Sequence, residues 1–271
     1  MVVPEQPQPA PLHNRVRDLW QAGTPSISAI LTIPSVPTVQ VLAHAGFDSL
    51  VVDMEHGPID LATAHAMITA TAGTPAVPYA RLPANLPWLA KPLLDAGVLG
   101  VIFPLSRDRA DAEAAVRATR YPPRGERSWG PFYAPLRWDR SMQDYLDTAD
   151  DAVIVALLIE TAEAVDNIEA IVATPGVDLA IIGGGDLATA MGHHGRAEHP
   201  DVRAAITRAE EAILGSGVVL GGAARSAEQA NAMIARGYRH ISLGFDWAML
   251  QRGAAGAQAG IRRPGDDGSV G

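Results

Sequence analysis

The sequence contains no cysteine, and this absence removes several kinds of chemistry. Disulfides, thiolate catalysis and cysteine-ligated zinc or iron–sulfur centres are all excluded. Basic residues are also few, since 21 lysines and arginines stand against 30 aspartates and glutamates, for a formal net charge of -9. Because a nucleic-acid partner requires a concentrated basic face, we expect no nucleic acid to bind.

Long hydrophobic runs are missing as well. The apolar stretches have the length of strands, far short of the roughly 20 residues that span a bilayer. The first residues have neither the basic start nor the apolar core of a signal peptide. We therefore expect a cytoplasmic protein with no membrane partner. Residues 1–12 and 259–271 are poor in side chains that can pack, so we expect disordered tails around one domain at 13–258.

Two apolar segments, 153–160 and 179–186, organise the rest of the chain. Each is short and unbroken and closes on a carboxylate, Glu160 in the first and Asp186 in the second. Such runs are typical of strands buried on both faces. The apolar residues of 161–173 recur at helical spacing, so a helix is expected to connect two parallel strands. Both carboxylates should therefore lie at the same edge of one sheet.

The strand–helix alternation continues along the chain. About eight such units follow one another, which is the number that closes a (β/α)8 barrel. An open doubly wound sheet is the rival fold, but no G-x-G-x-x-G motif follows the first strand and no change in composition divides the chain. We predict an α/β protein with a single-domain (β/α)8 TIM barrel. The proline- and glycine-rich loop 121–135 interrupts the alternation, and its three aromatic residues favour an ordered loop over a linker.

Polar side chains stand where the predicted strands end, and in a barrel these ends form the active-site mouth. Glu160 and Asp186, with no histidine or cysteine at the neighbouring strand ends, predict a hard divalent cation such as Mg²⁺ or Mn²⁺ that can chelate a 2-oxo acid. Asp53 can orient His56 for acid–base catalysis. Arg81 can neutralise these acids or hold a developing enolate oxygen. Each residue alone also fits a helix cap, a loop histidine or an ion pair, so the prediction rests on their combination.

Other polar groups are weaker candidates. The three glycines before Asp186 could offer backbone amides to an anion, or could simply form a tight turn. Three histidines look like a metal cluster in sequence: His193, His194 and His199. They occupy a polar loop that contains glycine and has no strand support, so we interpret them as surface residues. A phosphate site after the last two strands would have only Arg225 nearby, and no nucleophile elbow supports Ser-His-Asp hydrolysis.

Four segments occur in the order and setting of a known family: GFDSLVVDMEHG at 46–57, ATRYPPRGER at 118–127, Ile159-Glu160, and GGGDL at 183–187. From about residue 46 to 251 the chain resembles the HpcH/HpaI aldolases, which are metal-dependent (class II) pyruvate aldolases. The resemblance implies a (β/α)8 barrel that assembles as a hexamer, with the last helix packed on a neighbouring subunit.

The resemblance also implies a role for individual residues. Glu160 and Asp186 match the metal ligands, for Mg²⁺ or Mn²⁺ and also Co²⁺. The other matches are the acid–base dyad of His56 with Asp53, the enolate-steadying Arg81, the supporting acid Asp95, and the amides of Gly185 and Asp186 that hold the pyruvate carboxylate.

Three features near the site depart from the family pattern. The family usually has Gly-Pro-Ala-Asp where this chain has Gly183-Gly-Gly-Asp186, and Leu158 replaces a common glutamine. Residues 220–224 are smaller than the aliphatic segment that is typical there. These changes retain the expected ligands and dyad but alter their surroundings.

The predicted function is that of a carbon–carbon lyase. We expect an aldolase that cleaves or forms a 4-hydroxy-2-oxo acid, giving pyruvate or a close 2-oxo acid and an aldehyde through a metal-stabilised enolate. An oxaloacetate-type decarboxylase, or a specialised carbon–carbon bond-forming enzyme of the same superfamily, is the alternative, and a β-keto acid substrate would not need His56. A lyase acting on CoA thioesters, as in the citrate-lyase branch, is less favoured because the D-x-E-H segment at 53–56 does not belong to the pattern of that branch. A barrel that only binds would show no enolate exchange.

Overall fold

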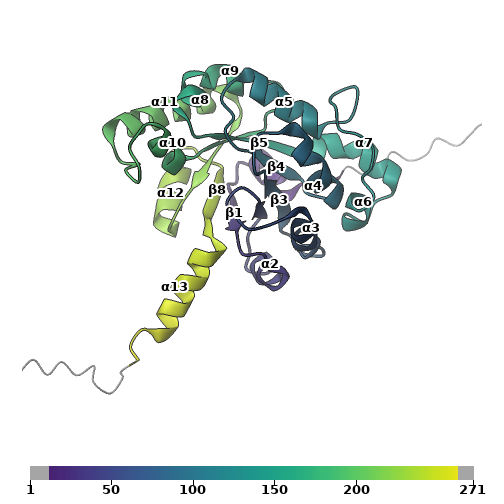
Figure 1. Cartoon of the computed structure of the whole chain (residues 1–271), viewed down its shortest axis with the longest axis horizontal. Helices are drawn as coiled ribbons and strands as arrows, with labels where there is room; N and C mark the ends of the chain where they lie inside the picture. The colour runs from purple at the N-terminus through teal and green to yellow at the C-terminus, as the bar shows by residue number, and fades with distance from the viewer. Residues whose placement is uncertain (1–11, 262–271) are drawn as a thin grey trace, which may run out of the picture.

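The computed structural model describes residues 12–261, which form a closed barrel of parallel strands (Figure 1). Each strand pairs with the next in sequence, and β8 returns to pair with β1. The strands are β1 (Ser26–Leu31), β2 (Ser49–Asp53), β3 (Val77–Arg81), β4 (Gly100–Phe103), β5 (Ile154–Ile159), β6 (Leu179–Ile182), β7 (Val219–Ala223) and β8 (His240–Phe245). The prediction of a (β/α)8 barrel is confirmed, and the open doubly wound sheet is excluded.

Helices surround the barrel on its outside (Figure 1). They are α1 (Arg15–Gln21), α2 (Val36–Ala43), α3 (Leu61–Thr69), the 3₁₀ helix η1 (Pro87–Leu89), α4 (Ala90–Ala96), α5 (Arg109–Thr119), α6 (Ala134–Arg137), α7 (Met142–Ala152), α8 (Ala162–Asp166), α9 (Ile168–Val172), α10 (Gly184–Ala190), α11 (Pro200–Ser216), α12 (Ala227–Ala235) and α13 (Asp246–Gln258). Several begin at a side chain that accepts from a first-turn amide, among them Asp60 before α3 and Asp108 before α5.

Some boundaries differ from those expected from the sequence. The segment 161–173 forms two short helices that meet at Asn167, where one continuous helix was expected. Helix α10 begins at Gly184, so two of the three glycines before Asp186 belong to its first turn. Strand β7 begins only at Val219, because Gly217 adopts a φ of 85° and ends α11 as its left-handed C-cap.

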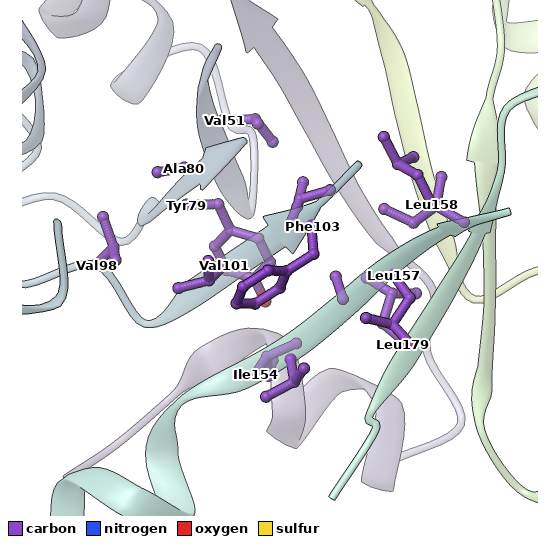
Figure 2. Packing of buried hydrophobic residues seen from close by; sticks show 14 of the residues in the cluster. Val51, Tyr79, Ala80, Val98, Val101, Phe103, Ile154, Leu157, Leu158 and Leu179 are labelled. Atoms are coloured by element: carbon purple, nitrogen blue, oxygen red, sulfur yellow. The ribbon is translucent and has the colours of Figure 1, made fainter. Parts of the chain in front are cut away.

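The core fills the barrel and the layer between strands and helices. Figure 2 shows buried residues of β3, β4 and β5, among them Tyr79, Phe103 and Ile154. A Cβ atom at residue 100 would lie 2.4 Å from the Tyr79 ring, so Gly100 is required for this tyrosine to enter the core. The polar strand ends therefore stand on a closely packed support.

A buried histidine occupies the barrel interior below the mouth. His240 is fully buried, with the Ser26 hydroxyl 2.9 Å from its Nδ1 and the Ser28 hydroxyl 3.3 Å from its Nε2. Burial lowers the pKa of His240 to about 4, so the ring is neutral at physiological pH. This cluster is therefore a polar layer of the core.

The two ends of the domain differ in how they pack. The predicted tails at 1–11 and 262–271 lie outside the described residues, but Leu12, which the predicted first tail included, is buried in the core. Helix α13 points away from the barrel (Figure 1), and all of its residues from 250 to 258 are exposed. Within residues 12–261, no helix has the length and apolar character that a membrane crossing requires.

Candidate active site and metal centre

Four of the predicted site residues lie at the carboxyl ends of strands. Asp53 and Arg81 are the last residues of β2 and β3 and are paired in register, while Glu160 directly follows β5. Asp186 lies in the first turn of α10, four residues after the end of β6. Parallel strands bring all four to the same mouth of the barrel.

Arg81 is held by a buried ion pair. Its Nε and Nη2 donate to the two oxygens of Asp53, at 2.9 and 2.7 Å, and Glu55 Oε2 lies 3.3 Å from its Nε. Burial lowers the pKa of the Arg81 guanidinium, but the hydrogen bond and charge of Asp53, with the charges of Glu55 and Glu160, raise it overall above the ordinary value. The guanidinium is therefore charged and fixed in orientation.

Glu160 is buried beside other negative charges. Its Oε1 accepts from the backbone N–H of Leu105 at 2.7 Å, and Leu105 has a φ of 51°, which is uncommon for a residue other than glycine. Burial and the charges of Glu55 and Asp186 raise the pKa of the Glu160 carboxyl to about 7, although the Leu105 bond and Arg81 lower it. The described groups thus do not fully offset the cost of burying the ionised Glu160 carboxylate, and the positive charge of a bound cation would do so.

Gly183 separates Glu160 from Asp186. A Cβ atom at this position would lie 2.9 Å from Glu160 Cβ, 3.2 Å from Glu160 Oε2 and 3.9 Å from Asp186 Oδ2. The missing side chain lets both carboxylates border one space, and the negative charge of Glu55 contributes to the raised pKa of Glu160. A set of carboxylate oxygens suits a hard divalent ion, so a divalent metal ion fits this site.

His56 lies on the turn that follows β2. Asp53 Oδ1 accepts from the backbone amides of Glu55 and His56, at 3.1 and 3.4 Å, and so holds the turn. The His56 side chain is 60% exposed, and its Nε2 lies 3.9 Å from Glu55 Oε2. The structure therefore connects Asp53 to the His56 backbone and to Arg81, and it places Glu55 beside the imidazole.

Glu55 is a site residue that reasoning from the sequence missed. It carries a raised pKa, because burial outweighs the lowering effects of Arg81 and His56. A signal was available, since Glu55 is an acid within the same four-residue turn as Asp53 and His56. Its role was hidden because a turn does not disclose which of its side chains face the mouth.

Asp95 stands apart from the other predicted residues. It accepts from Arg127 Nη2 at 2.9 Å, on the side of α4 that faces the loop 121–135. Arg127 is almost fully buried, and its guanidinium carbon lies 4.5 Å from the ring centroid of Tyr121 and 5.6 Å from that of Tyr145. Within one chain, Asp95 therefore orders this loop, and Arg127 is a second residue that the sequence did not single out.

The first turn of α10 presents backbone amides near the two carboxylates. The Gly183 N–H is bonded to Ile159 O, and the next three amides, of Gly184, Gly185 and Asp186, begin the helix and have no acceptor within it. A Cβ atom at Gly185 would meet nothing within 4 Å. These amides can therefore receive a carboxylate oxygen.

Comparison with known proteins agrees with this geometry. A sequence model of the HpcH/HpaI aldolase/citrate lyase family matches residues 35–252. The chain is 38% identical to 4-hydroxy-2-oxo-heptane-1,7-dioate aldolase of Klebsiella pneumoniae, over 90% of this chain and 92% of that protein.

Two solved structures show the same fold over nearly the whole chain. One is an HpcH/HpaI aldolase/citrate lyase family protein from Burkholderia cenocepacia, with a TM-score of 0.86, 36% identity, and coverage of 93% of this chain and 100% of that one. The other is macrophomate synthase, with a TM-score of 0.82, 27% identity, and coverage of 93% and 89%. The chain belongs to the HpcH/HpaI aldolase/citrate lyase family and is a carbon–carbon lyase.

Proposed function

We propose that this protein is a metal-dependent aldolase that cleaves a 4-hydroxy-2-oxo acid to pyruvate, or a close 2-oxo acid, and an aldehyde, and that also runs the reverse reaction. The observation that carries the proposal is the pair of carboxylates around Gly183, next to a fixed arginine at the barrel mouth. We also propose that the enzyme works in the cytoplasm.

Glu160 and Asp186 would hold the metal ion, which we expect to be Mg²⁺ or Mn²⁺, with Co²⁺ as a substitute. When bound, such an ion polarises the oxygens of a 2-oxo acid and stabilises negative charge that develops on them. The raised pKa of Glu160 supports this assignment, because ligation requires the ionised carboxylate and would supply the charge compensation that its burial demands.

The remaining groups would orient the substrate. The amides of Gly185 and Asp186 can donate to the carboxylate of the 2-oxo acid. Asp53 accepts from Nε and from one N–H of Nη2 of Arg81, so the N–H groups of Nη1 and the second N–H of Nη2 remain to donate to the enolate oxygen. Because the ion pair prevents Arg81 from turning, these donors are positioned before the bond breaks.

His56 would move the proton. In cleavage it takes the proton of the 4-hydroxyl group, and in synthesis it returns that proton to the new alkoxide. Asp53 acts on His56 by holding its backbone, and Glu55, 3.9 Å from Nε2, is the carboxylate placed to stabilise the protonated ring. The exposure of the imidazole is consistent with transfer through a water molecule.

We propose that the chain assembles as a homohexamer in which α13 packs on a neighbouring subunit. Trp247 and Leu250 of α13 are 51% and 67% exposed, and a helix of this length has little stability without a packing partner. Asp95 pairs with Arg127 of its own chain, and in the hexamer it would support catalysis in a neighbour's site. Replacing Trp247 and Leu250 by serine should reduce the mass measured by light scattering; an unchanged hexamer would contradict this role of α13.

Hydrogen exchange in pyruvate tests the enolate chemistry. Metal-stripped protein is incubated with pyruvate in D₂O, alone and with Mg²⁺, Mn²⁺ or Co²⁺, and methyl deuteration is measured by mass spectrometry. We expect metal-dependent exchange that is lost in Glu160→Gln and retained in Glu163→Gln, an exposed glutamate on the next helix. The absence of exchange with every metal would contradict the proposal.

The role of His56 separates aldol cleavage from decarboxylation. His56→Ala should retain pyruvate exchange and metal affinity but cleave a 4-hydroxy-2-oxo acid at least about 100-fold more slowly, as the loss of a general base predicts. Oxaloacetate decarboxylation should be unaffected in this variant, since a β-keto acid needs no hydroxyl deprotonation. An unchanged rate of aldol cleavage would rule out His56 as the base.

A further inference from the structure

We propose that the protein has a second cation site, distinct from the barrel mouth, for a divalent ion that prefers nitrogen ligands, such as Zn²⁺ or Ni²⁺. It is formed by His193, His199 and Asp201, where the loop after α10 meets the start of α11. The loop lies on the surface, as expected, but it brings two of its three histidines together with an aspartate.

The three side chains have the separations that a metal site requires. One ligand atom from each lies within 4.8 Å of the other two. Asp201 Oδ2 is 3.8 Å from His193 Nε2 and 3.7 Å from His199 Nδ1. For metal–ligand bonds of about 2.0–2.1 Å, the donors of a tetrahedral site stand about 3.4 Å apart. Rotation of one imidazole out of its stack on the other, so that the planes of both rings contain the ion, together with a small contraction of these separations, would bring the donors to zinc, with water in the remaining position.

The two imidazoles are partly enclosed and lie against each other. Their ring centroids are 3.6 Å apart, with 15° between the planes, and the side chains of His193 and His199 are 20% and 31% exposed. Among the described residues, the buried Nδ1 of His193 has no hydrogen-bond partner. Nδ1 of His199 accepts from the Asp201 N–H at 3.3 Å and so presents a lone pair, which a metal ion would take over from this long bond.

The backbone of both histidines is held in place by hydrogen bonds. The His193 N–H donates to Ala188 O of α10 at 2.7 Å, and the His199 N–H donates to Arg196 O at 2.9 Å. His199 is also the N-cap of α11. An ion at this cluster would therefore connect the carboxyl end of α10, the helix that carries Asp186, to the beginning of α11.

The two sites differ in donor chemistry. The mouth offers carboxylate oxygens, which suit Mg²⁺ and Mn²⁺, whereas imidazole nitrogens favour Zn²⁺, Ni²⁺ and Cu²⁺. The protein should therefore bind one Mn²⁺ per chain and two Zn²⁺ per chain. This difference gives a readout that does not depend on the substrate or on the activity of the enzyme.

Metal counting tests the site directly. Metal-stripped, full-length protein is dialysed against buffered Zn²⁺, and bound zinc is measured by mass spectrometry. We expect two Zn²⁺ per chain, falling to one in His193→Gln and in His199→Asn, of which the second retains a residue favoured at helix N-caps. His194→Gln, which replaces an exposed histidine of the same loop, is the matched control and should keep two. All variants should still bind one Mn²⁺, which verifies that they are folded.

A spectroscopic measurement makes the test independent of the metal counts. Electron paramagnetic resonance of Cu²⁺ bound to His56→Ala, which has no imidazole at the barrel mouth, should still show coupling to imidazole nitrogens, and this coupling should be lost when His193→Gln is added. The proposal would be overturned by a single Zn²⁺ that disappears in Glu160→Gln and is insensitive to the histidine variants. The absence of nitrogen coupling would overturn it equally.

Discussion

Replacing Glu160 by glutamine is expected to stabilise the metal-free protein at alkaline pH, although it removes a proposed metal ligand. Burial and the charges of Glu55 and Asp186 raise the pKa of this carboxyl from 4.5 to about 7. Glutamine keeps an oxygen that can accept from the Leu105 amide but carries no charge. The substitution therefore removes the unfavourable ionisation and leaves the local hydrogen bond in place.

The size of the effect follows from the two pKa values. Below pH 4.5 the carboxyl is protonated in the folded and the unfolded chain, and it does not change stability. As the pH rises to about 7, the unfolded chain releases its proton while the folded protein retains it, so the free energy of unfolding decreases. One pKa unit corresponds to about 1.4 kcal/mol, which gives a loss of about 3 kcal/mol above pH 7.

Thermal unfolding with a chelator present measures this difference. At about 2–4 °C per kcal/mol, the Tm of Glu160→Gln should exceed that of the unaltered protein by roughly 6–12 °C at pH 8, and by much less at pH 5. Added Mn²⁺ should raise the Tm of the unaltered protein but not that of Glu160→Gln, because the ionised carboxylate is the proposed ligand. Glu163→Gln, in which an exposed glutamate is replaced, should shift the Tm little at either pH.

The reasoning would be refuted by a Tm difference of equal size at pH 5 and pH 8. It would be refuted as well if the glutamine variant were the less stable protein at pH 8 without metal, because the buried charge would then not oppose folding.

Three further predictions concern neighbouring groups. Asp53→Asn should lower the free energy of unfolding in urea by roughly 3–5 kcal/mol, because it leaves the buried Arg81 without its partner; a smaller loss would mean that Glu55 compensates. Gly183→Ala should weaken Mn²⁺ binding about tenfold or more, or by about 1.4 kcal/mol, because the added Cβ would lie 2.9 Å from Glu160 Cβ. Gly185→Ala should leave Mn²⁺ binding unchanged, because a Cβ there would meet nothing within 4 Å. Burial lowers the pKa of His240 to about 4, so the free energy of unfolding should decrease by about 3 kcal/mol as the pH falls from 6.5 towards 4. If the free energy of unfolding of His240→Gln decreases equally over this range, the histidine is not the cause.

Chemistry at the strand ends could be predicted because it depends on local order. A buried parallel strand is a short apolar run, and the residue at which that run stops must lie at the edge of the sheet. Asp53, Arg81 and Glu160 were placed at the barrel mouth by this argument alone, and the structure has them there. The fold was predictable for the same reason, since parallel strands joined by helices allow few arrangements.

Partners within the mouth were not predictable from spacing. Asp53 and His56 are three residues apart, yet the Asp53 carboxylate crosses to the next strand and engages Arg81. Glu55, between them in sequence, is the acid that lies beside the imidazole. A turn can direct its side chains in several ways, and only the register between β2 and β3 decides which of them meet.

Contacts between distant segments depended wholly on tertiary structure. Asp95 and Arg127 lie on different elements, and their ion pair forms because the loop 121–135 folds back over α4. The stacking of His193 on His199 likewise depends on how the loop turns between α10 and α11. The sequence by itself determined the order of strands and helices and the chemistry at the strand ends, because periodicity and chain direction are local properties. Which charges pair, and which are left to meet a cation, was decided by packing, because those distances exist only once the barrel has closed.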